Sequence, residues 1–542
     1  MEYFTTKRPI FLVPSDKCNE EFEKIDKFLI FLEESGVWKI IKSVKLKRSV
    51  CKGRKGYDSY KLLAAIVYCF AKFKASLRDI EDKCLFDIRV LYIMDGNIPD
   101  HSTFGNFIND YIVPYQYEIF TTIVKHIIKK FNLVIEDAYD DGSKFEANAN
   151  KYKFVWKPTK FHQKLDIKIK SLLGEMGYVE EANNKDLIKT DKFNSILKDY
   201  VYKNNIDINN LPGGKGVRTT KEIKNYKLAY QYLIKLLEYE EKERICGKNR
   251  NSYFKTDKDA TAMMLKEDYY SKLSHDFHAA YNVQVLVSNL LIVMYGVYQD
   301  RTDYYTLIPL YDNYYKYYGS YPKNAVGDSG YGIYTNYKYL REHNIGNYLK
   351  FQQWNGESSG KRPQLFYTFD DGIMCLNTNI GKEISFKTNS AHQRNKDTKL
   401  YIFEGCNNRN YSYICKKSLK NKDENFRKVE LNPDYELLKE QARNNLLSPK
   451  GIEIRINRSI QVEGTFGQIK NNMNYERIRR RGLKNVSCEV MLECLGVNIR
   501  RLLDSFEDSK FKDNCWDTPN NLHKETFPYV KQKKETVKKS IN

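Results

Sequence analysis

The chain has 542 residues, enough for several domains of about 100 to 200 residues each and for a large buried core. Lysine and arginine number 90 against 69 acidic residues, and the formal net charge of +21 favours a polyanionic partner. The 11 cysteines include no CxxC pair, and no secretory leader is seen, so we expect reduced thiols in a cytoplasmic protein rather than a disulfide-rich secreted one. The most apolar run, residues 283–298, is shorter than the ~20 residues of a membrane span, so we expect no membrane partner.

Residues 1–130 are predicted to form a helical N-terminal domain. Apolar residues recur at helical spacing in residues 62–70 and 120–128. Polar capping residues after a Gly/Pro break mark the start of another helix within residues 99–107. A small DNA-binding domain fits this pattern, and a helical packing domain without DNA contacts is the alternative.

The pattern changes after Phe131. Residues 133–144 predict a strand that ends at Asp140 and Asp141, followed by a Gly turn. Strand ends are where open α/β sheets place their ligands, although Asp-Gly is also a common turn dipeptide. We therefore assign residues 131–155 to the first part of an α/β core.

Two insertions are predicted to interrupt this core. Residues 156–251 are rich in Lys, Glu and Asn with spaced Leu and Ile, and predict a charged helical insertion. Residues 352–439 carry alternating aromatic stretches and predict a β-rich insertion. Three cysteines of the second insertion lack the short paired spacing of a zinc site and are interpreted as structural thiols: Cys375, Cys406 and Cys415.

The second part of the core is assigned to residues 252–351. Residues 279–287 and 290–299 predict a β-hairpin. Asp303 is interpreted as a capping residue of the amphipathic helix that follows. Asp328 follows a short buried strand and opens a Gly-rich turn, so it projects from a strand end; an ordinary turn Asp is the alternative.

A helix at residues 458–470 is the centre of the third part of the core, residues 440–505. Ile460, Glu463, Phe466 and Lys470 fall at spacings of three, three and four, so we expect them along one side of the helix. On such a packed face an uncompensated carboxylate costs several kcal/mol, which favours a metal ion at Glu463. A solvated helix with an ordinary surface Glu is the alternative.

A second amphipathic helix is predicted at residues 487–502, where it could pack beside the first. Residues 506–542 form a basic tail that we expect to fray.

Asp141, Asp328 and Glu463 lie more than a hundred residues apart, so folding alone could bring them together. Such a cluster of hard oxygen ligands suits Mg²⁺. Two Mg²⁺ ions can activate an attacking oxygen and stabilise a leaving one in an in-line displacement at phosphorus. The excess of Lys and Arg would hold the phosphodiester backbone.

Ordered segments from most of the chain carry a family resemblance. They are residues 76–81, 99–103, 141–152 with Val155 and Trp156, 256–260, 281–284, 327–331, 457–470 and 479–482. Together they resemble the DDE transposases of bacterial insertion sequences, most nearly the insertion-sequence family eleven-eighty-two.

The resemblance implies an α/β fold with a ribonuclease-H-like, mixed-sheet catalytic core. Asp141, Asp328 and Glu463 would be the catalytic residues and would bind two Mg²⁺ ions, with Mn²⁺ as a substitute. Asp140 remains an alternative first ligand. Water would cleave at the ends of the element, and the freed 3′-hydroxyl would attack target DNA.

The resemblance also implies DNA-contacting cations. These are Lys144, Arg458, Lys470, Arg479, Arg480 and Arg481, of which Lys470 matches the Glu-then-Lys spacing of the related group. Ser459 and Ile456 stand where that wider group has an Arg and a Tyr, and Arg458 is displaced by one residue. The cleavage pathway, with or without a hairpin intermediate, therefore stays open.

The partners implied are double-stranded DNA, as terminal inverted repeats and as target, and a second copy of the chain, because two ends must be joined in one complex. The implied location is the bacterial nucleoid. Two alternatives remain: a catalytically inactive or repurposed sequence-specific DNA-binding protein, and a ribonuclease-H-like nuclease that cuts without joining.

Overall fold

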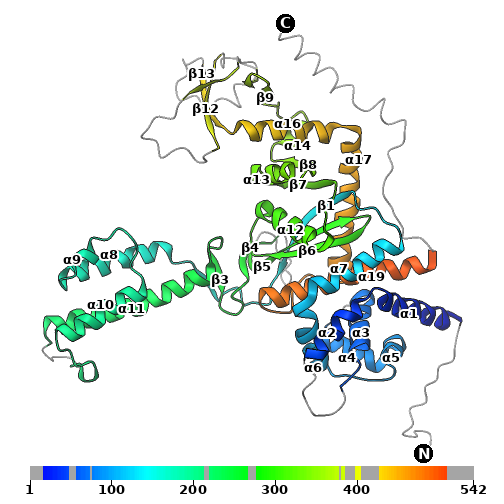
Figure 1. Cartoon of the computed structure of the whole chain (residues 1–542), viewed down its shortest axis with the longest axis horizontal. Helices are drawn as coiled ribbons and strands as arrows, with labels where there is room; N and C mark the ends of the chain where they lie inside the picture. Colours follow the sequence, from blue (N-terminus) through cyan, green and yellow to red (C-terminus); the bar gives the residue numbers. More distant parts are fainter. Residues whose placement is uncertain are drawn as a thin grey trace, which may run out of the picture.

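The structure is a computed structural model that describes residues 16–47, 56–73, 76–212, 219–265, 276–376, 380–384, 397–404 and 426–508. A mixed β-sheet lies at the centre, helices from both ends of the chain pack below it, and two parts project from it (Figure 1). One projecting part is a helical arm, and the other is a small β-module above the sheet. This mixed α/β architecture is compatible with the expected ribonuclease-H-like core.

The N-terminal part of the chain is helical, as predicted. Its elements are α1 (Asp16–Glu34), α2 (Val37–Lys47), α3 (Ser59–Lys72), α4 (Leu77–Phe86), α5 (Ile88–Ile93), α6 (His101–Phe107), the turns η1 (Ile108–Ile112) and η2 (Val113–Tyr115), and α7 (Gln116–Lys130). The capping residue predicted near position 100 is Asp100, whose side chain accepts a hydrogen bond of 2.6 Å from the backbone N–H of Thr103 at the start of α6. The apolar side chains of these helices belong to the same hydrophobic core as those of the sheet. The helical region is thus packed onto the core rather than separated from it by a linker.

The central sheet has the strand order β4-β5-β1-β7-β8, with β6 also paired to β5. Its strands are β1 (Asp137–Glu146), β4 (Thr261–Met264), β5 (Phe277–Ser288), β6 (Leu291–Tyr298), β7 (Asn324–Gly332) and β8 (Gly346–Phe351). β1, β7 and β8 run parallel, whereas β5 is antiparallel to β1, β4 and β6. The predicted hairpin is confirmed as β5–β6, and its turn is made by Asn289 and Leu290 with φ of 51° and 60°.

Helices connect and cover these strands. They are the turn η4 (Asp303–Tyr305), α12 (Leu307–Tyr318), α13 (Tyr334–Glu342) and, near the C-terminus, α19 (Leu483–Asp508). α12 contacts β6 and α13 contacts β7 and β8, while α19 packs between β6 and α3. The Asn498 side chain anchors α19 to the sheet, because it accepts from the backbone N–H of Ile292 at 2.9 Å and donates to its carbonyl at 2.8 Å.

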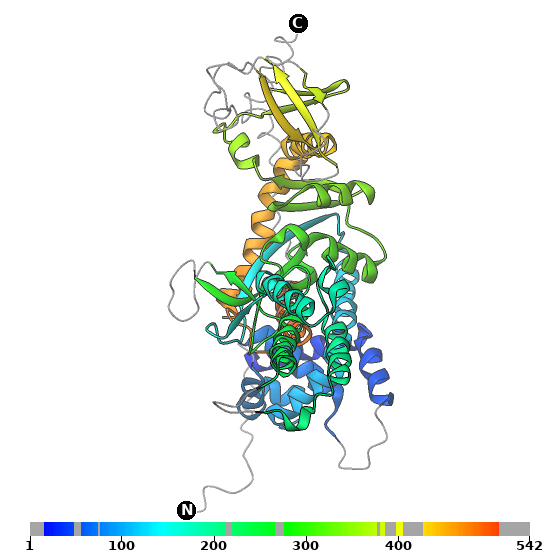
Figure 2. The same ribbon diagram turned by 90° about the vertical axis from the view of Figure 1, so that its left-hand side faces the viewer.

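The helices of the arm lie within residues 156–251, the predicted charged helical insertion. The arm contains α8 (Thr159–Glu175), α9 (Val179–Ala182), α10 (Thr190–Lys203), η3 (Ile208–Asn210) and α11 (Lys221–Cys246), and its base is the antiparallel pair β2 (Phe154–Trp156) and β3 (Ser252–Phe254). The arm has a hydrophobic core of its own, separate from the main one. It extends sideways in Figure 1, and in the view turned by 90° it points toward the viewer (Figure 2).

The β-module falls within the predicted β-rich insertion. It contains α14 (Trp354–Ser358), the pair β9 (Phe366–Phe369) and β10 (Gly372–Cys375), and the three strands β11 (Lys382–Ile384), β12 (Lys399–Glu404) and β13 (Phe426–Leu431). Cys375 is buried in it, whereas Cys406 and Cys415 lie outside the described residues. α16 (Pro433–Leu447) leads from this module back to the sheet.

A nearly continuous helical run then carries the chain past the sheet. It consists of α17 (Pro449–Arg458), the π-helical turn η6 (Ser459–Glu463), α18 (Gly464–Gly467) and a second π-helical turn, η7 (Gln468–Asn472). α17 contacts β7, and η6 contacts β1 and β5. Most of the predicted basic tail lies outside the described residues, which end at Asp508. Among the described helices, none is long and apolar enough to cross a membrane.

Candidate active site

Asp141 and Asp328 lie on neighbouring parallel strands at the same level of the sheet. The last paired residues of β1 and β7 are Tyr139 and Val326, and each aspartate comes two residues later in its strand. Beyond this point β1 and β7 are no longer paired, so the two carboxylates lie where the parallel part of the sheet opens. Such openings at the carboxyl ends of parallel strands are the usual ligand sites of α/β sheets.

The prediction that the first strand ends at Asp141 is wrong. β1 continues to Glu146, because β5 keeps pairing with it beyond the aspartates, with Asp141 opposite Val285 and Glu146 opposite Ala280. Asp328 likewise lies inside β7 rather than at its end. Loss of the parallel partner, not the end of either strand, therefore creates the opening.

Lys350 on β8 extends this level of the sheet to a third strand. Gly327 pairs with Leu349, so Asp328 and Lys350 are the next residues of their two strands. Burial lowers the pKa of Lys350, and so do the charges of Arg458 and Arg455, whereas Asp328 and Glu463 act in the opposite direction. Lys350 is thus within electrostatic reach of both acids, although no motif in the sequence singles it out.

Arg458 makes an ion pair with Asp141. Its Nη2 donates to Asp141 Oδ1 at 3.0 Å, and the two side chains are only 12% and 22% exposed. Burial raises the pKa of Asp141 to about 6; Arg458 lowers it, and the charges of Asp328 and Asp303 raise it. The sequence predicted Arg458 as a DNA contact, but here its guanidinium faces a candidate metal ligand.

Asp140, the alternative first ligand, points to the opposite side of β1. Adjacent residues of a strand face opposite sides of a sheet. Asp140 is completely buried, accepts a 2.8 Å hydrogen bond from the Tyr311 hydroxyl, and has its pKa raised well above the usual range by burial. These surroundings favour a neutral core carboxyl, so Asp141 is the better candidate ligand.

Asp303 is a fourth carboxylate at the opening. Its interpretation as a helix cap is wrong, because no side-chain cap is made at the start of η4 or α12. Instead Asp303 Oδ1 accepts from the side-chain amides of Asn282 at 2.8 Å and Gln284 at 2.7 Å. The sequence did carry a signal for this role of Asp303. Asn282 and Gln284 lie two residues apart on a strand predicted to be buried, and buried side-chain amides need a hydrogen-bond partner inside the protein.

Two glycines make room for this arrangement. A Cβ at position 142 would lie 2.0 Å from Gln284 Nε2 and 2.9 Å from Asp303 Oδ1. A Cβ at position 330 would lie 2.9 Å from Asp328 Oδ1 and 3.2 Å from Asp303 Oδ2. Glycine at position 142 therefore lets Gln284 cross β1 to Asp303, and the environment of Gly330 shows that Asp303 and Asp328 face the same small space.

Glu463 is exposed at the end of η6, so its predicted position on a packed face is wrong. The reason is the pair of π-helical turns, which place extra residues in each turn and shift the apolar side away from the expected spacing. The buried side consists instead of Asn457, Gln461, Val462, Thr465, Phe466 and Ile469. Glu463 remains close enough to Lys350 to influence its charge.

The three predicted acids do not form a closed ligand set. Among the described residues, no group of three or more His, Cys, Asp or Glu side chains is arranged to hold a metal ion. Asp141 and Asp328 are neighbours, whereas Glu463 belongs to the helical run and is linked to Asp328 only through the influence of both charges on Lys350.

The lysines predicted to contact DNA both lie near the end of β1. Lys470 Nζ lies 4.9 Å from the centre of the Phe145 ring, and Phe145 belongs to β1. Lys144 Nζ donates to the carbonyl of Met264 at 3.4 Å, a long contact that leaves its charge available.

The predicted arginines lie on a loop, Arg477–Arg481, which we call the arginine loop. Buried Glu489 on α19 accepts hydrogen bonds of 3.0 Å and 2.7 Å from the backbone N–H groups of Arg479 and Arg480. The side chains of Arg480 and Arg481 bond to Asn109 and to the carbonyl of Asn148, at 2.8 Å and 2.7 Å. The backbone of the loop is therefore fixed by α19, and its side chains bridge the N-terminal helices and the end of β1.

Comparison with known protein families matches one part of the chain. Residues 374–503 match the family model described as a transposase DDE domain. The matched residues run from the β-module through Glu463 and the arginine loop into α19, and they do not include Asp141 or Asp328. A search of curated proteins finds no match to the chain. The family match supports a DDE transposase, an enzyme of the polynucleotidyl transferase type encoded by a mobile element.

Proposed function

We propose that this chain is a DNA transposase that binds the ends of its insertion sequence, cleaves the phosphodiester backbone and transfers the 3′-hydroxyl ends into target DNA. From the resemblance of the sequence motifs we infer that it is nearest to the insertion-sequence family eleven-eighty-two. The observation that carries the proposal is the position of Asp141 and Asp328 at one level of the sheet, two residues beyond the last parallel pair. Glu463, the third predicted acid, lies in the segment 374–503 that matches a transposase DDE domain.

The donor set fits divalent cations. Asp141 and Asp328 offer hard oxygen ligands, and the charges of Asp328 and Asp303 raise the pKa of Asp141, a repulsion that a bound cation would relieve. We infer that Asp141, Asp328 and Glu463 hold the metal and that Glu463 joins the two aspartates when metal and DNA are present. Two Mg²⁺ ions, or Mn²⁺ in their place, would activate the attacking oxygen and stabilise the leaving one.

Cations of the chain itself prepare the site for a phosphodiester. Arg458 supplies positive charge beside Asp141, and Lys350 supplies it near Asp328 and Glu463. Lys144, Lys470 and the arginine loop add positive charge around the end of β1, where they would neutralise phosphates of double-stranded DNA. Because both ends of an element must meet before joining, we expect the active form to be a homodimer.

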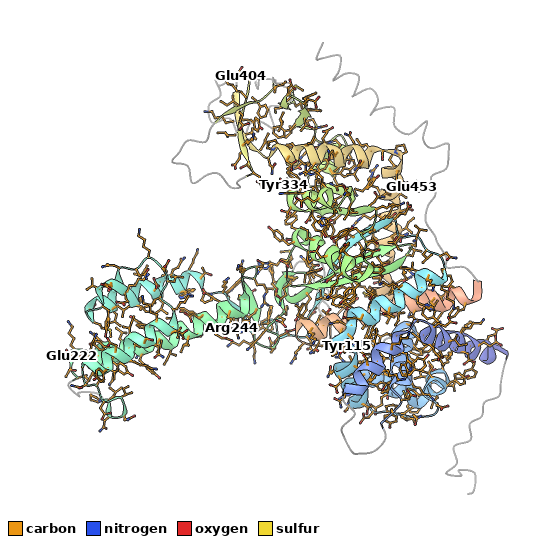
Figure 3. All side chains as sticks on the ribbon, viewed as in Figure 1. Tyr115, Glu222, Arg244, Tyr334, Glu404 and Glu453 are labelled. Atoms are coloured by element: carbon orange, nitrogen blue, oxygen red, sulfur yellow. The ribbon has the colours of Figure 1, made fainter. Side chains whose placement is uncertain are left out.

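The test is an assay of cleavage and strand transfer on labelled DNA that carries the ends flanking the gene. Wild-type protein is compared with Glu463→Gln, in Mg²⁺ and in EDTA. Glu453→Gln is the matched control, because Glu453 lies on α17 of the same helical run and precedes Glu463 by about three helical turns (Figure 3). We expect Mg²⁺-dependent joined products from wild type and from the control, and none from Glu463→Gln.

Other results would change the assignment. Tight DNA binding without cleavage, under conditions in which a related transposase is active, would indicate an inactive or repurposed DNA-binding protein. Cleavage without joined products would indicate a nuclease. Full activity of Glu463→Gln would remove Glu463 from the proposed metal site.

A further inference from the structure

The helix α11 of the arm has two apolar sides. Tyr226, Ala229, Leu233 and Leu236 face the core of the arm and are buried. A second set, Tyr230, Ile234 and Leu237, is 49%, 52% and 50% exposed. We call this second set the outer stripe. A surface helix normally has a polar outer side, so an apolar outer stripe indicates a surface that is covered by a partner.

The spacing of the outer stripe is that of a helix-pairing seam. Its residues are separated by four and then three positions, the alternation by which one helix packs along another. The stripe is accessible in the chain, and the arm that carries it extends sideways from the sheet (Figure 1).

Charges at the two ends of the stripe are of opposite sign. Lys224 and Lys227 precede it, and Glu238 and Glu241 follow it. The two glutamates already contact Lys242 and Arg244 within the helix. Such exposed pairs contribute little energy, so the glutamates can exchange partners at small cost.

This charge pattern selects a second copy of the same helix. In a two-fold symmetric contact the same surface meets itself in reverse, so the basic end of one helix lies against the acidic end of the other. An antiparallel pair of α11 helices would therefore bury the outer stripes at its centre and place lysines opposite glutamates at both ends. A parallel pair would place like charges together, which is unfavourable.

We propose that the arm is a dimerisation element whose outer stripe pairs antiparallel with the outer stripe of a second copy. This inference rests on the proposed function, which expects a homodimer, and the outer stripe would supply the contact surface of that dimer. Glu222 lies at the far end of the arm and Arg244 near the sheet, as Figure 3 shows. An antiparallel pair along the 26 residues of α11, about 39 Å, would hold the two catalytic cores at opposite ends of the contact.

The test measures the mass of the full chain without DNA, by sedimentation velocity over a range of concentrations. Two double charge reversals are compared with wild type: Lys224→Glu with Lys227→Glu, and Glu238→Lys with Glu241→Lys. Each reversal places like charges at both ends of the contact, so we expect dimerisation to weaken by about tenfold or more. Lys164→Glu with Lys168→Glu, on the exposed side of α8, is the control and should leave the dimer unchanged.

Mixing the two reversed variants gives the decisive measurement. In the mixed dimer the two reversed ends meet at one end of the contact and the two unchanged ends meet at the other, so opposite charges face each other at both ends. Equimolar mixing should therefore restore dimers of mixed composition. Ile234→Asp, placed at the centre of the stripe, should yield a monomer that no mixing restores. Circular dichroism checks that the variants keep their helices.

Three outcomes would overturn the proposal: a monomeric wild type at all concentrations, a dimer indifferent to both reversals, or reversals whose loss is not restored on mixing. None of these measurements uses catalysis. Failure of the proposed function would appear separately, as a dimeric wild type that does not cleave DNA.

Discussion

Replacing Asp141 with asparagine should stabilise the metal-free protein above pH 6. Burial raises the pKa of folded Asp141 to about 6, whereas its ordinary value is 3.8. The ionised carboxylate is therefore less favourable in the folded than in the unfolded chain. Protonated Asp141 therefore contributes fully to the stability of the folded protein below pH 3.8, and this contribution is lost as the pH rises through about 6.

The size of the effect follows from the difference between the two pKa values. A difference of about two units corresponds to ~3 kcal/mol, at about 1.4 kcal/mol for each unit. Asparagine keeps the shape of the carboxyl group but cannot ionise. We expect Asp141→Asn to exceed wild type by less than ~1 kcal/mol near pH 4 and by about 2 to 3 kcal/mol at pH 8.

The assay is urea denaturation of both proteins in EDTA between pH 4 and pH 8. Added Mg²⁺ should reverse the order, because a ligand that binds only the folded wild type stabilises it by mass action. A variant less stable than wild type at pH 8, or a gain that does not change with pH, would refute the explanation. It would mean that the ion pair with Arg458 outweighs the burial of Asp141.

Three further changes test other parts of the site. Gly142→Ala should lower the free energy of unfolding in urea by about 2 to 5 kcal/mol, because the new methyl group would displace buried Gln284 and leave its hydrogen bonds unmade. Gly464→Ala is the control: its Cβ would meet open space, so the change should be neutral or stabilise its helix by ~0.5 to 1 kcal/mol. Glu489→Ala should weaken DNA binding and reduce the slope of log affinity against log salt, because the arginine loop loses its backbone anchor; an unchanged slope would mean that the loop holds its shape without Glu489. Asp328→Ala should abolish cleavage and leave DNA affinity largely intact, and loss of binding in that variant would contradict the separation of metal ligation from phosphate contact.

Local patterns were sufficient where neighbouring residues decide the structure. The alternating and apolar runs on either side of Asn289 predicted the β5–β6 hairpin, because a short turn between two strands forces them to pair. The polar residues near Asp100 predicted the start of α6, because a cap needs only the first turn of its own helix.

Local patterns predicted the wrong structure where distant segments compete for a residue. The Asp-Gly turn signal after β1 was overridden, because β5 supplies backbone hydrogen bonds to β1 as far as Glu146. The helical spacing around Glu463 was overridden by two π-helical turns, one of which brings Gln461 to the backbone N–H of Leu290 in the hairpin turn. Asp303 was assigned to a cap because its true partners lie on β5, about twenty residues earlier.

The sequence by itself determined the charge, the hairpin, the helical character of both ends and the candidate acids, since these depend on composition and on contacts between near neighbours. Only the tertiary structure decided that Asp141, Asp328 and Lys350 share one level of the sheet, that Asp140 is buried on the other side, that Arg458 pairs with Asp141, and that Asp303 is held by Asn282 and Gln284. The physical reason is the register of parallel strands. That register is set by packing between segments far apart in the chain, and a shift of one residue would turn each of these side chains to the opposite face.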